Sequence, residues 1–244
     1  MTVDDLHETL ARARTLTFDC YGTLIDWSRG LGRVFREVFG LEVADRRHDE
    51  LFAAYVQIEA EIEAEPYRLY REVLGMTLER LAAKLGLPLP PDKKDELAAM
   101  LATWTPFADT NDALARLKKK FRLGVLSNID RDLFAGTARH FSVAFDFLIC
   151  AEDVRSYKPA PGHFERLRQE EGSLDHVIHV AQSLYHDGAA AKKLDLAFVW
   201  INRYSEPRAS ARADVRPYAE FPDLRSFAKA ACRQSPSRLG RGPG

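Results

Sequence analysis

Apolar residues recur at two different spacings along the chain. Short, mostly apolar runs rich in β-branched residues alternate with longer segments in which apolar side chains return every three or four positions. The short runs indicate buried strands, and the longer segments indicate amphipathic helices. The predicted strands are Thr15–Phe18, Arg122–Leu126, Phe145–Ile149, His176–Ala181 and Leu196–Ile201. Because strands that alternate with helices form parallel sheets covered on both faces, the pattern predicts an α/β fold.

One long segment departs from this alternation. From Trp27 to about Thr103, apolar side chains keep a helical spacing and no strand is evident. Pro66 and Gly86 close two of the predicted helices, and a fourth helix is predicted over about Asp92 to Thr103. Most apolar residues in this segment are expected to pack in its core. The clearest stripes are Leu31, Val34, Phe35, Val38 and Phe39; Leu51, Tyr55, Ile58 and Ile62; and Tyr70, Val73, Leu74, Leu78, Leu81 and Leu85.

These patterns divide the chain into three parts. Residues 1–26 and 104–232 are predicted to form a Rossmann-like core domain with a parallel sheet. Residues 27–103 are predicted to form an inserted helical cap domain, which could close a site on the core and exclude water. Residues 233–244 are rich in Ser, Pro, Gly and Arg, and we expect a disordered tail there.

Composition narrows the function classes. The 244 residues include 35 basic and 36 acidic side chains, so the net charge of −1 gives no field that would attract nucleic acid or an anionic membrane. The three cysteines, Cys20, Cys150 and Cys232, match no zinc-binding spacing and are expected to be free thiols. No apolar run resembles a signal peptide or approaches the ~20 residues that span a membrane. We therefore expect a cytoplasmic protein that acts on a small molecule.

The first predicted strand leads directly into Asp19. Gly22 then allows the chain to turn sharply. An acid at the carboxyl end of a buried strand lies where open α/β sheets bind their ligands. Taken alone, the stretch is also compatible with an aspartate that only caps a turn or a helix.

The hexapeptide Asp19-Cys20-Tyr21-Gly22-Thr23-Leu24 resembles the first motif of the haloacid dehalogenase superfamily. In that motif the aspartate is a nucleophile, and the Tyr-Gly-Thr portion is most similar to the 2-haloacid dehalogenase branch. Superfamily phosphatases usually carry a second aspartate, the general acid, where this chain has Tyr21. Because a phenol has a pKa of about 10, Tyr21 is a poor replacement acid for phosphate esters.

Three later segments resemble the remaining motifs. Ser127-Asn128 resembles the second motif, although the same pair commonly begins a turn. Lys158, followed by Pro159, resembles the third motif, in which an ammonium beside the nucleophile keeps it ionised. The segment from His179 to Asp187 resembles the fourth.

The fourth motif argues against a metal. Gln182 occupies the position at which superfamily phosphatases have an aspartate that helps to bind Mg²⁺. Mg²⁺ prefers carboxylate oxygens, so an amide is a weak substitute. Asp187 stands where dehalogenases also have an aspartate. We therefore expect no essential metal and no cofactor.

The resemblance implies a hydrolase similar to the (S)-2-haloacid dehalogenases. Asp19 would displace halide from a small 2-haloalkanoic acid, and water would then hydrolyse the resulting ester. A departing halide needs a polar cradle, for which Asn128 is the candidate. The catalytic residues implied are Asp19, Lys158, Asp187, Thr23, Ser127 and Asn128; those implied to bind substrate are Tyr21, Cys20, Gln182, Ser183, His186 and Tyr185. The partner implied is a small carboxylic acid, and a homodimer is compatible because relatives often dimerise.

The chain also departs from the dehalogenase pattern. An arginine on the early cap helix of well-known members aligns with Ala54, and Arg46, Arg47, Arg68 and Arg71 are the candidates to replace it. Dehalogenases often have a tyrosine after the third motif, where this chain has Phe164. They also often have an aromatic residue at the position of His186. His186 is equally compatible with an acid or base near neutral pH and with a loop residue of no special role.

These departures keep three other functions open. One is the same aspartyl chemistry on another bond, such as the C–N bond of a strained ring, for which a protonated His186 would assist the leaving group. A second is a Mg²⁺-dependent phosphatase that tolerates Tyr21 and Gln182. A third, disfavoured by the joint presence of Asp19, Ser127, Lys158 and Asp187, is a relative without catalytic activity that only binds a ligand.

Overall fold

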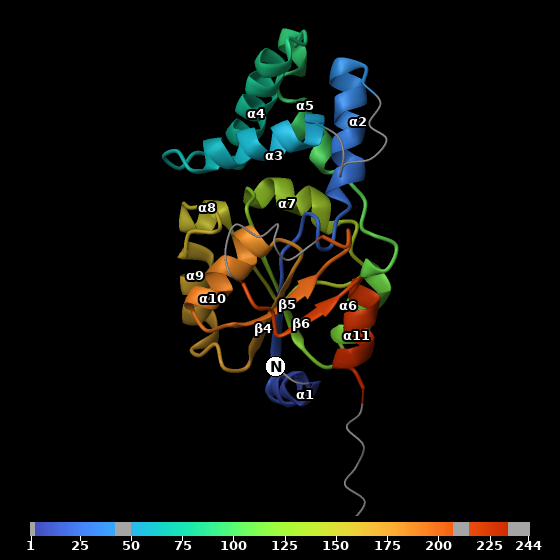
Figure 1. Ribbon diagram of the computed structural model, residues 1–244, viewed down its shortest axis with the longest axis vertical. Helices are drawn as coiled ribbons and strands as arrows, with labels where there is room; N and C mark the ends of the chain where they lie inside the picture. Colours follow the sequence, from blue (N-terminus) through green and yellow to red (C-terminus); the bar gives the residue numbers. More distant parts are fainter. Residues whose placement is uncertain (1–2, 42–49, 207–214, 234–244) are drawn as a thin grey trace, which may run out of the picture.

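A six-stranded parallel sheet forms the centre of the computed structural model, which describes residues 3–41, 50–206 and 215–233 (Figure 1). The strand order is β3-β2-β1-β4-β5-β6. The strands are β1 (Thr15–Phe18), β2 (Arg122–Ser127), β3 (Phe147–Cys150), β4 (Val177–Ala181), β5 (Ala197–Ile201) and β6 (Ala219–Phe221). The predicted α/β fold is thus confirmed, with β1 in the interior of the sheet.

Helices cover both faces of this sheet. Buried side chains of α6 (Thr110–Leu117) and α11 (Leu224–Ala231) pack on one face, and those of α9 (Gly162–Glu171) and α10 (Ala189–Lys193) pack on the other. The remaining helices of this part are α1 (Val3–Arg12), α7 (Arg131–Ala138), α8 (Ala151–Val154) and the single-turn η2 (Leu184–Gly188). No helix within the described ranges is long and apolar enough to cross a membrane.

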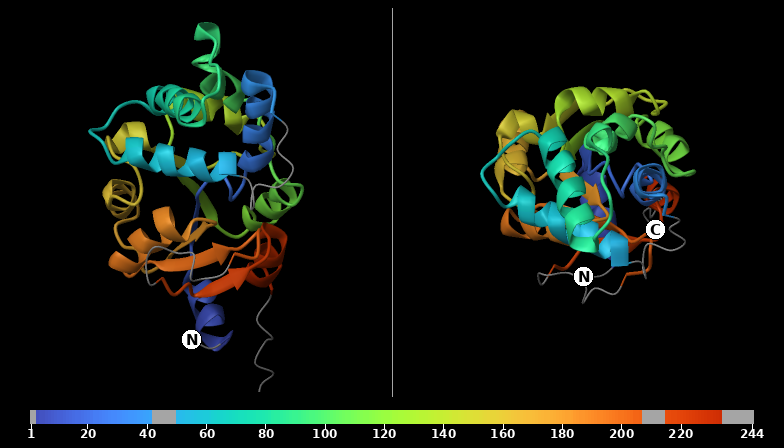
Figure 2. Two further views of the ribbon diagram at one scale, coloured as in Figure 1. Left: turned by 45° about the horizontal axis from the view of Figure 1, so that its top comes forward. Right: turned by 90° about the horizontal axis from the view of Figure 1, so that it is seen from above.

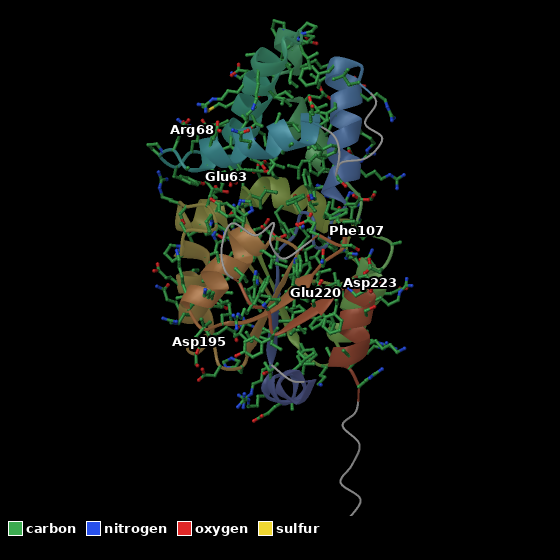
Figure 3. All side chains as sticks on the ribbon, in the orientation of Figure 1. Glu63, Arg68, Phe107, Asp195, Glu220 and Asp223 are labelled. Atoms are coloured by element: carbon green, nitrogen blue, oxygen red, sulfur yellow. The ribbon has the colours of Figure 1, made fainter. Side chains whose placement is uncertain are left out.

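The segment between β1 and β2 forms a separate group of helices. It contains α2 (Trp27–Phe39), α3 (Glu50–Glu63), α4 (Tyr70–Leu85), η1 (Pro91–Lys93) and α5 (Glu96–Leu101). Figures 1 and 2 show these helices beyond one end of the sheet, on the side of α7 and away from α1. Figure 3 shows that Glu63 lies between this group and the sheet.

Local sequence explains the bounds of these helices. The carboxylate of Asp26 accepts a hydrogen bond from the backbone N–H of Arg29 at 3.2 Å and so caps the start of α2. Gly40 and Gly86 follow α2 and α4 with φ values of 66° and 65°, in the left-handed region that glycine adopts without strain.

The structure differs from the sequence-based expectations in four elements. The fourth predicted helix is two pieces, η1 and α5, and α1 and β6 were not predicted. The third strand begins at Phe147, and just before it Asp146 is bonded to Leu123 through both its backbone N–H and its carboxylate, each at 2.7 Å. The predicted disordered tail lies almost wholly outside the described residues.

Two glycines of α2 provide a matched test of packing between α2 and Trp104, which follows α5. A Cβ atom on Gly30 would lie 2.3 Å from the ring of Trp104, whereas a Cβ on Gly32 would meet nothing within 4 Å. We therefore expect Gly30→Ala to lower the free energy of unfolding by ~1–3 kcal/mol through overpacking. Gly32→Ala should raise it by ~0.5–1 kcal/mol through helix propensity. Urea denaturation of both variants checks this, and equal effects would contradict it.

Candidate active site

Asp19 stands at the carboxyl end of β1, directly after Phe18. Phe18 is level with Val125 of β2 and Val180 of β4, so Asp19 lies where the strand order reverses direction around β1. Such a switch point is the usual ligand site of an open parallel sheet. The chain then turns at Gly22, whose φ of 96° suits glycine and whose Cβ, if present, would lie 3.0 Å from Trp27.

Both oxygens of the Asp19 carboxylate are held by donors. The hydroxyl of Thr23 donates to Oδ2 at 2.8 Å and accepts a hydrogen bond from the backbone N–H of Gln182 at 2.9 Å. The ammonium of Lys158 donates to Oδ1 at 3.0 Å. Thr23 therefore links the turn after β1 to the segment after β4 and fixes the orientation of Asp19.

Lys158 is the central cation of the site. Its side chain is buried, and its ammonium donates to Asp19, to the carbonyl of Leu126 at 2.9 Å and to Oδ1 of Asp187 at 2.6 Å. These three hydrogen bonds use all three donors of an ammonium. The amide of Asn128 holds the backbone on either side, accepting from the N–H of Lys158 at 2.7 Å and donating to its carbonyl at 3.1 Å.

Asp187 is fixed through one oxygen only. Its Oδ1 accepts from Lys158 and is 2.9 Å from Nε2 of His179, whose Nδ1 is 2.9 Å from the hydroxyl of Thr17. Its Oδ2 is buried and has no hydrogen-bond partner. Because buried carboxylate oxygens are normally satisfied, Oδ2 is positioned to accept a hydrogen bond from a ligand or a water molecule.

The pKa values of the three groups follow from burial and their mutual charges. Burial raises the pKa of Asp19 above its usual value, although the charge of Lys158 opposes this rise. For Asp187, the charge of Lys158 and the hydrogen bond from His179 outweigh burial and lower the pKa. Burial disfavours the ammonium of Lys158, but the two aspartates outweigh it and raise the pKa. The site thus places two carboxyl groups with opposite pKa shifts around one cation.

A cavity of about 190 Å³ opens onto Asp19 between the sheet and the inserted helices. From the core it is lined by Asp19, Tyr21, Ser127, Asn128, Lys158, Gln182, Ser183, His186 and Asp187. The structure therefore brings together nine of the residues singled out from the sequence. Thr23 stands behind Asp19. Cys20 is instead buried in the apolar core, and Tyr185 lines a neighbouring cavity.

Inserted helices contribute residues that sequence reasoning missed. Glu59 and Glu63 of α3 line the cavity, together with the aromatic side chains of Trp27, Tyr55, Tyr70 and Trp104. Their spacing could have identified them. Tyr55, Glu59 and Glu63 recur every four residues beside the apolar stripe of α3 and so share one helix face. His179 was also missed, because a histidine within an apolar strand has no distinctive pattern.

Among the described residues, neither Arg68 nor Arg71, two of the candidates to replace the cap arginine of related dehalogenases, lines this cavity. Arg68 pairs with Glu65 at 2.8 Å, and Arg71 pairs with Asp132, so both guanidinium groups are engaged elsewhere. Arg46 and Arg47 lie outside the described residues. Across the described ranges, no group of three or more acidic, histidine or cysteine side chains is arranged to hold a metal ion.

Comparisons with known proteins agree with this geometry. A sequence model described as haloacid dehalogenase-like hydrolase matches residues 13–195. An (S)-2-haloacid dehalogenase of Pseudomonas fluorescens is 29% identical over 224 residues, which cover 84% of this chain and 92% of that protein. An (S)-2-haloacid dehalogenase of Pseudomonas putida is 28% identical over 226 residues, covering 84% and 93%.

Solved structures show the same fold. The L-2-haloacid dehalogenase of Xanthobacter autotrophicus superposes with a TM-score of 0.74 at 19% identity, covering 89% of this chain and 97% of that one. That protein has also been solved with chloropropionic acid covalently bound. A dehalogenase with an intermediate complex superposes with a TM-score of 0.78 at 19% identity, covering 91% and 99%.

Removal of the central cation should destabilise the fold in a pH-dependent way. We expect Lys158→Met to lower the free energy of unfolding by ~3–5 kcal/mol at neutral pH, because it leaves Asp19 and Asp187 buried without their cation. Both folded pKa values then rise above those of the unfolded chain. The folded variant takes up protons first on acidification, so the penalty shrinks as pH falls through the raised values.

Urea denaturation at about pH 7 and about pH 5 measures this change. The exposed Lys119→Met provides the control and should stay within ~0.5 kcal/mol of the parent at both pH values. A penalty for Lys158→Met that is the same at both pH values would show that the two carboxylates are not its cause.

Proposed function

The chain belongs to the haloacid dehalogenase-like hydrolase family, and we propose that it hydrolyses a carbon–halogen bond with Asp19 as the nucleophile. The observation that carries this proposal is the arrangement of Asp19 and Asp187 on the single ammonium of Lys158, with both carboxylates facing a cavity of about 190 Å³. The (S)-2-haloacid dehalogenase names of the two Pseudomonas relatives support the choice of bond.

In the first step, an oxygen of Asp19 attacks the carbon that bears the halogen. A C–O bond forms, the C–halogen bond breaks, and the halide leaves with the bonding electron pair. Lys158 and Thr23 hold the carboxylate in one orientation, which reduces the entropy lost in reaching the transition state. The product of this step is an ester between Asp19 and the substrate carbon.

In the second step, water hydrolyses the ester at the carbonyl carbon of Asp19. Asp187 is the candidate base, because the residue lines the cavity and its buried Oδ2 has no hydrogen-bond partner, which leaves that oxygen able to accept a proton from the attacking water. The bond between the Asp19 carbonyl carbon and the substrate oxygen breaks, and the alcohol leaves. Asp19 then carries one oxygen from water, and one proton is released.

The departing halide needs a hydrogen-bond donor. The amide of Asn128, the candidate from sequence, already donates to the carbonyl of Lys158 and lies 3.3 Å from Glu63. Trp104 lines the same cavity, and its Nε1–H is buried without a partner. We therefore assign the halide contact to Trp104, with Asn128 positioning Lys158.

Phosphate ester hydrolysis fits these residues less well. Tyr21, which stands where phosphatases have their general acid, has its hydroxyl 2.7 Å from that of Thr137. Burial raises the pKa of Tyr21 well above its usual value, so the phenol is a still weaker acid. A halide leaves without a proton and needs no such acid. We propose the same metal-independent route for the whole reaction, with residues 27–103 acting as the cap that excludes water.

Loss of the nucleophile should abolish halide release. We expect Asp19→Asn to lower kcat by ~10⁴-fold or more, with 2-chloroacetate, both 2-chloropropionate enantiomers and 2-chloroacetamide as the test panel. The exposed Asp112→Asn is the control and should retain the parent rate. Wild-type release should persist with EDTA. Halide release that requires added Mg²⁺ would contradict the proposal.

Isotope transfer tests the ester directly. After repeated turnover in water enriched in ¹⁸O, we expect the label in the peptide that contains Asp19, because water attacks the carbonyl carbon of that residue. Mass spectrometry of the digested protein measures the label. Label in the product alcohol after one turnover, with an unlabelled Asp19, would indicate direct attack of water on the substrate.

The decrease of kcat/KM at acidic pH should follow the protonation of Asp19. Only the ionised carboxylate attacks, and burial raises its pKa, so kcat/KM should fall as pH drops through that raised value and stay level above it. Asp187, whose pKa is lowered, stays ionised over the same range. Rates from about pH 4 to about pH 8, with folding checked by circular dichroism at each pH, measure this limb. A rate independent of pH would argue against a buried carboxylate nucleophile.

A further inference from the structure

Acidic groups dominate the charge of the cavity that contains Asp19. Four carboxyl side chains line it, from Asp19, Glu59, Glu63 and Asp187. Lys158 is the one lysine or arginine among its described lining residues, and its three donors are all engaged by Asp19, Asp187 and Leu126. No described arginine or lysine is therefore left to bind a substrate carboxylate there.

Glu59 is held as an acceptor. The hydroxyls of Tyr55 and Tyr70 both donate to its Oε1, at 2.6 Å and 2.8 Å, and no described residue donates to its Oε2. Burial raises the pKa of Glu59 above its usual value, and the hydrogen bonds from the two hydroxyls oppose this rise. Glu59 thus lines the cavity with one carboxyl oxygen, Oε2, that receives no donor from the described residues.

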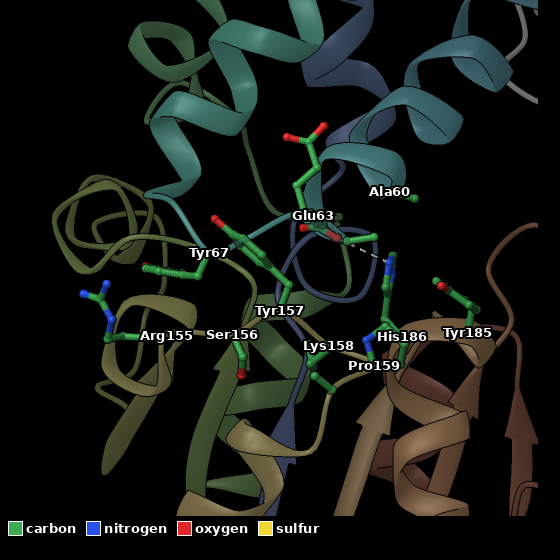
Figure 4. A pocket seen from close by; sticks show the side chains of 13 residues that line it. Ala60, Glu63, Tyr67, Arg155, Ser156, Tyr157, Lys158, Pro159, Tyr185 and His186 are labelled. Atoms are coloured by element: carbon green, nitrogen blue, oxygen red, sulfur yellow. Dashed lines mark ion pairs between the residues drawn. The ribbon is translucent and has the colours of Figure 1, made fainter.

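Glu63 lies one helical turn further along α3. The amide of Asn128 donates to it at 3.3 Å, and Nε2 of His186 is 3.7 Å from its Oε2 (Figure 4). Glu63, Lys158 and His186 also line a neighbouring cavity of about 380 Å³, which Arg155 and Tyr67 border on the far side. The guanidinium of Arg155 lies 5.3 Å from the centre of the Tyr67 ring and does not line the cavity of Asp19.

We propose that this cavity selects a halogenated substrate that carries an N–H donor, an amide or an ammonium group, which binds to Glu59 and Glu63 while Asp19 attacks the carbon bearing the halogen. This inference rests on the proposed dehalogenation. Burial raises the pKa of both glutamates, but a carboxyl oxygen accepts an N–H donor in either protonation state. Because the described lining offers no free cation to a substrate carboxylate, the site favours an amine or amide over a free acid.

Aromatic walls agree with this substrate class. Trp27, Tyr55, Tyr70 and Trp104 line the same cavity as the two glutamates. Ring faces attract ammonium groups, and an aromatic site with carboxylates is suited to bind cations. The reaction would release halide and convert the C–halogen carbon to an alcohol, giving a hydroxylated amide or amine.

Binding of inert probes tests the charge preference without any chemistry. Propionate, propionamide and propylammonium are similar in size, lack a halogen and differ in the group offered to the glutamates. We expect propionamide or propylammonium to bind the wild-type protein at least about tenfold more tightly than propionate in calorimetric titration. Comparing the affinities of propionamide and propylammonium shows whether the site prefers a neutral amide or a cation.

Isosteric variants test whether Glu59 and Glu63 cause the preference for nitrogen probes. Glu59→Gln and Glu63→Gln should each weaken binding of the nitrogen probes by about tenfold, because an amide is a weaker acceptor than a carboxylate. Propionate binding should stay unchanged or improve. Glu61→Gln is the matched control, since Glu61 is exposed on the same helix and is bonded to Gln57. It should leave all three affinities unchanged.

Turnover separates the two proposals. Halide release should be faster from 2-chloroacetamide or 2-chloroethylamine than from 2-chloroacetate, after subtraction of the reaction without enzyme. Preferred turnover of 2-chloroacetate, or tighter binding of propionate, would overturn the inference and leave the dehalogenation intact. Tighter nitrogen-probe binding without halide release from any of the three would support the pocket assignment and remove the proposed reaction.

Discussion

A single buried ammonium group organises the site. Lys158 could not remain charged away from water without the carboxylates of Asp19 and Asp187, and neither carboxylate could remain ionised there without Lys158. Three segments at the sheet edge serve this triad: Asp19 directly follows β1, β2 supplies the carbonyl of Leu126, and the segment after β4 carries Asp187. The two aspartates differ in their second donor, which is His179 for Asp187 and the hydroxyl of Thr23 for Asp19.

The order of the strands places Asp19, Lys158 and Asp187 close together. Parallel strands place their carboxyl ends at one edge of the sheet, and the reversal of strand order at β1 opens a crevice there. Thr23 then joins the turn after β1 to the backbone of Gln182, and Arg203 donates to the carbonyl of Thr23 at 2.8 Å. The carboxylate of Asp19 is therefore held by Thr23 on one oxygen and by Lys158 on the other, which limits its motion.

Sequence predicted the core of the site better than its cap side. Asp19 directly follows β1, Asp187 lies in the segment after β4, and Lys158 follows α8, and each stands in a recognisable motif. Glu59 and Glu63 carry no such pattern, because an acidic residue on a helix is usually exposed, and only the packing of α3 against the core turns them inward. The short β6 escaped prediction because three residues, Ala219–Phe221, are too few to show a period.

The charges that line the cavity affect both substrate binding and the departure of the halide in the proposed reaction. In the proposed reaction, the attacking carboxylate contacts only the carbon and the leaving group. The remote part of the substrate is then free to vary and would contact the inserted helices. Around Asp19 the cavity already holds three more carboxyl groups against one ammonium, and the reaction adds a halide anion to them. A substrate acid would increase this excess of negative charge at the moment the halide departs. An N–H donor against Glu59 and Glu63 would instead offset part of it, so that the cap acids assist binding without opposing displacement.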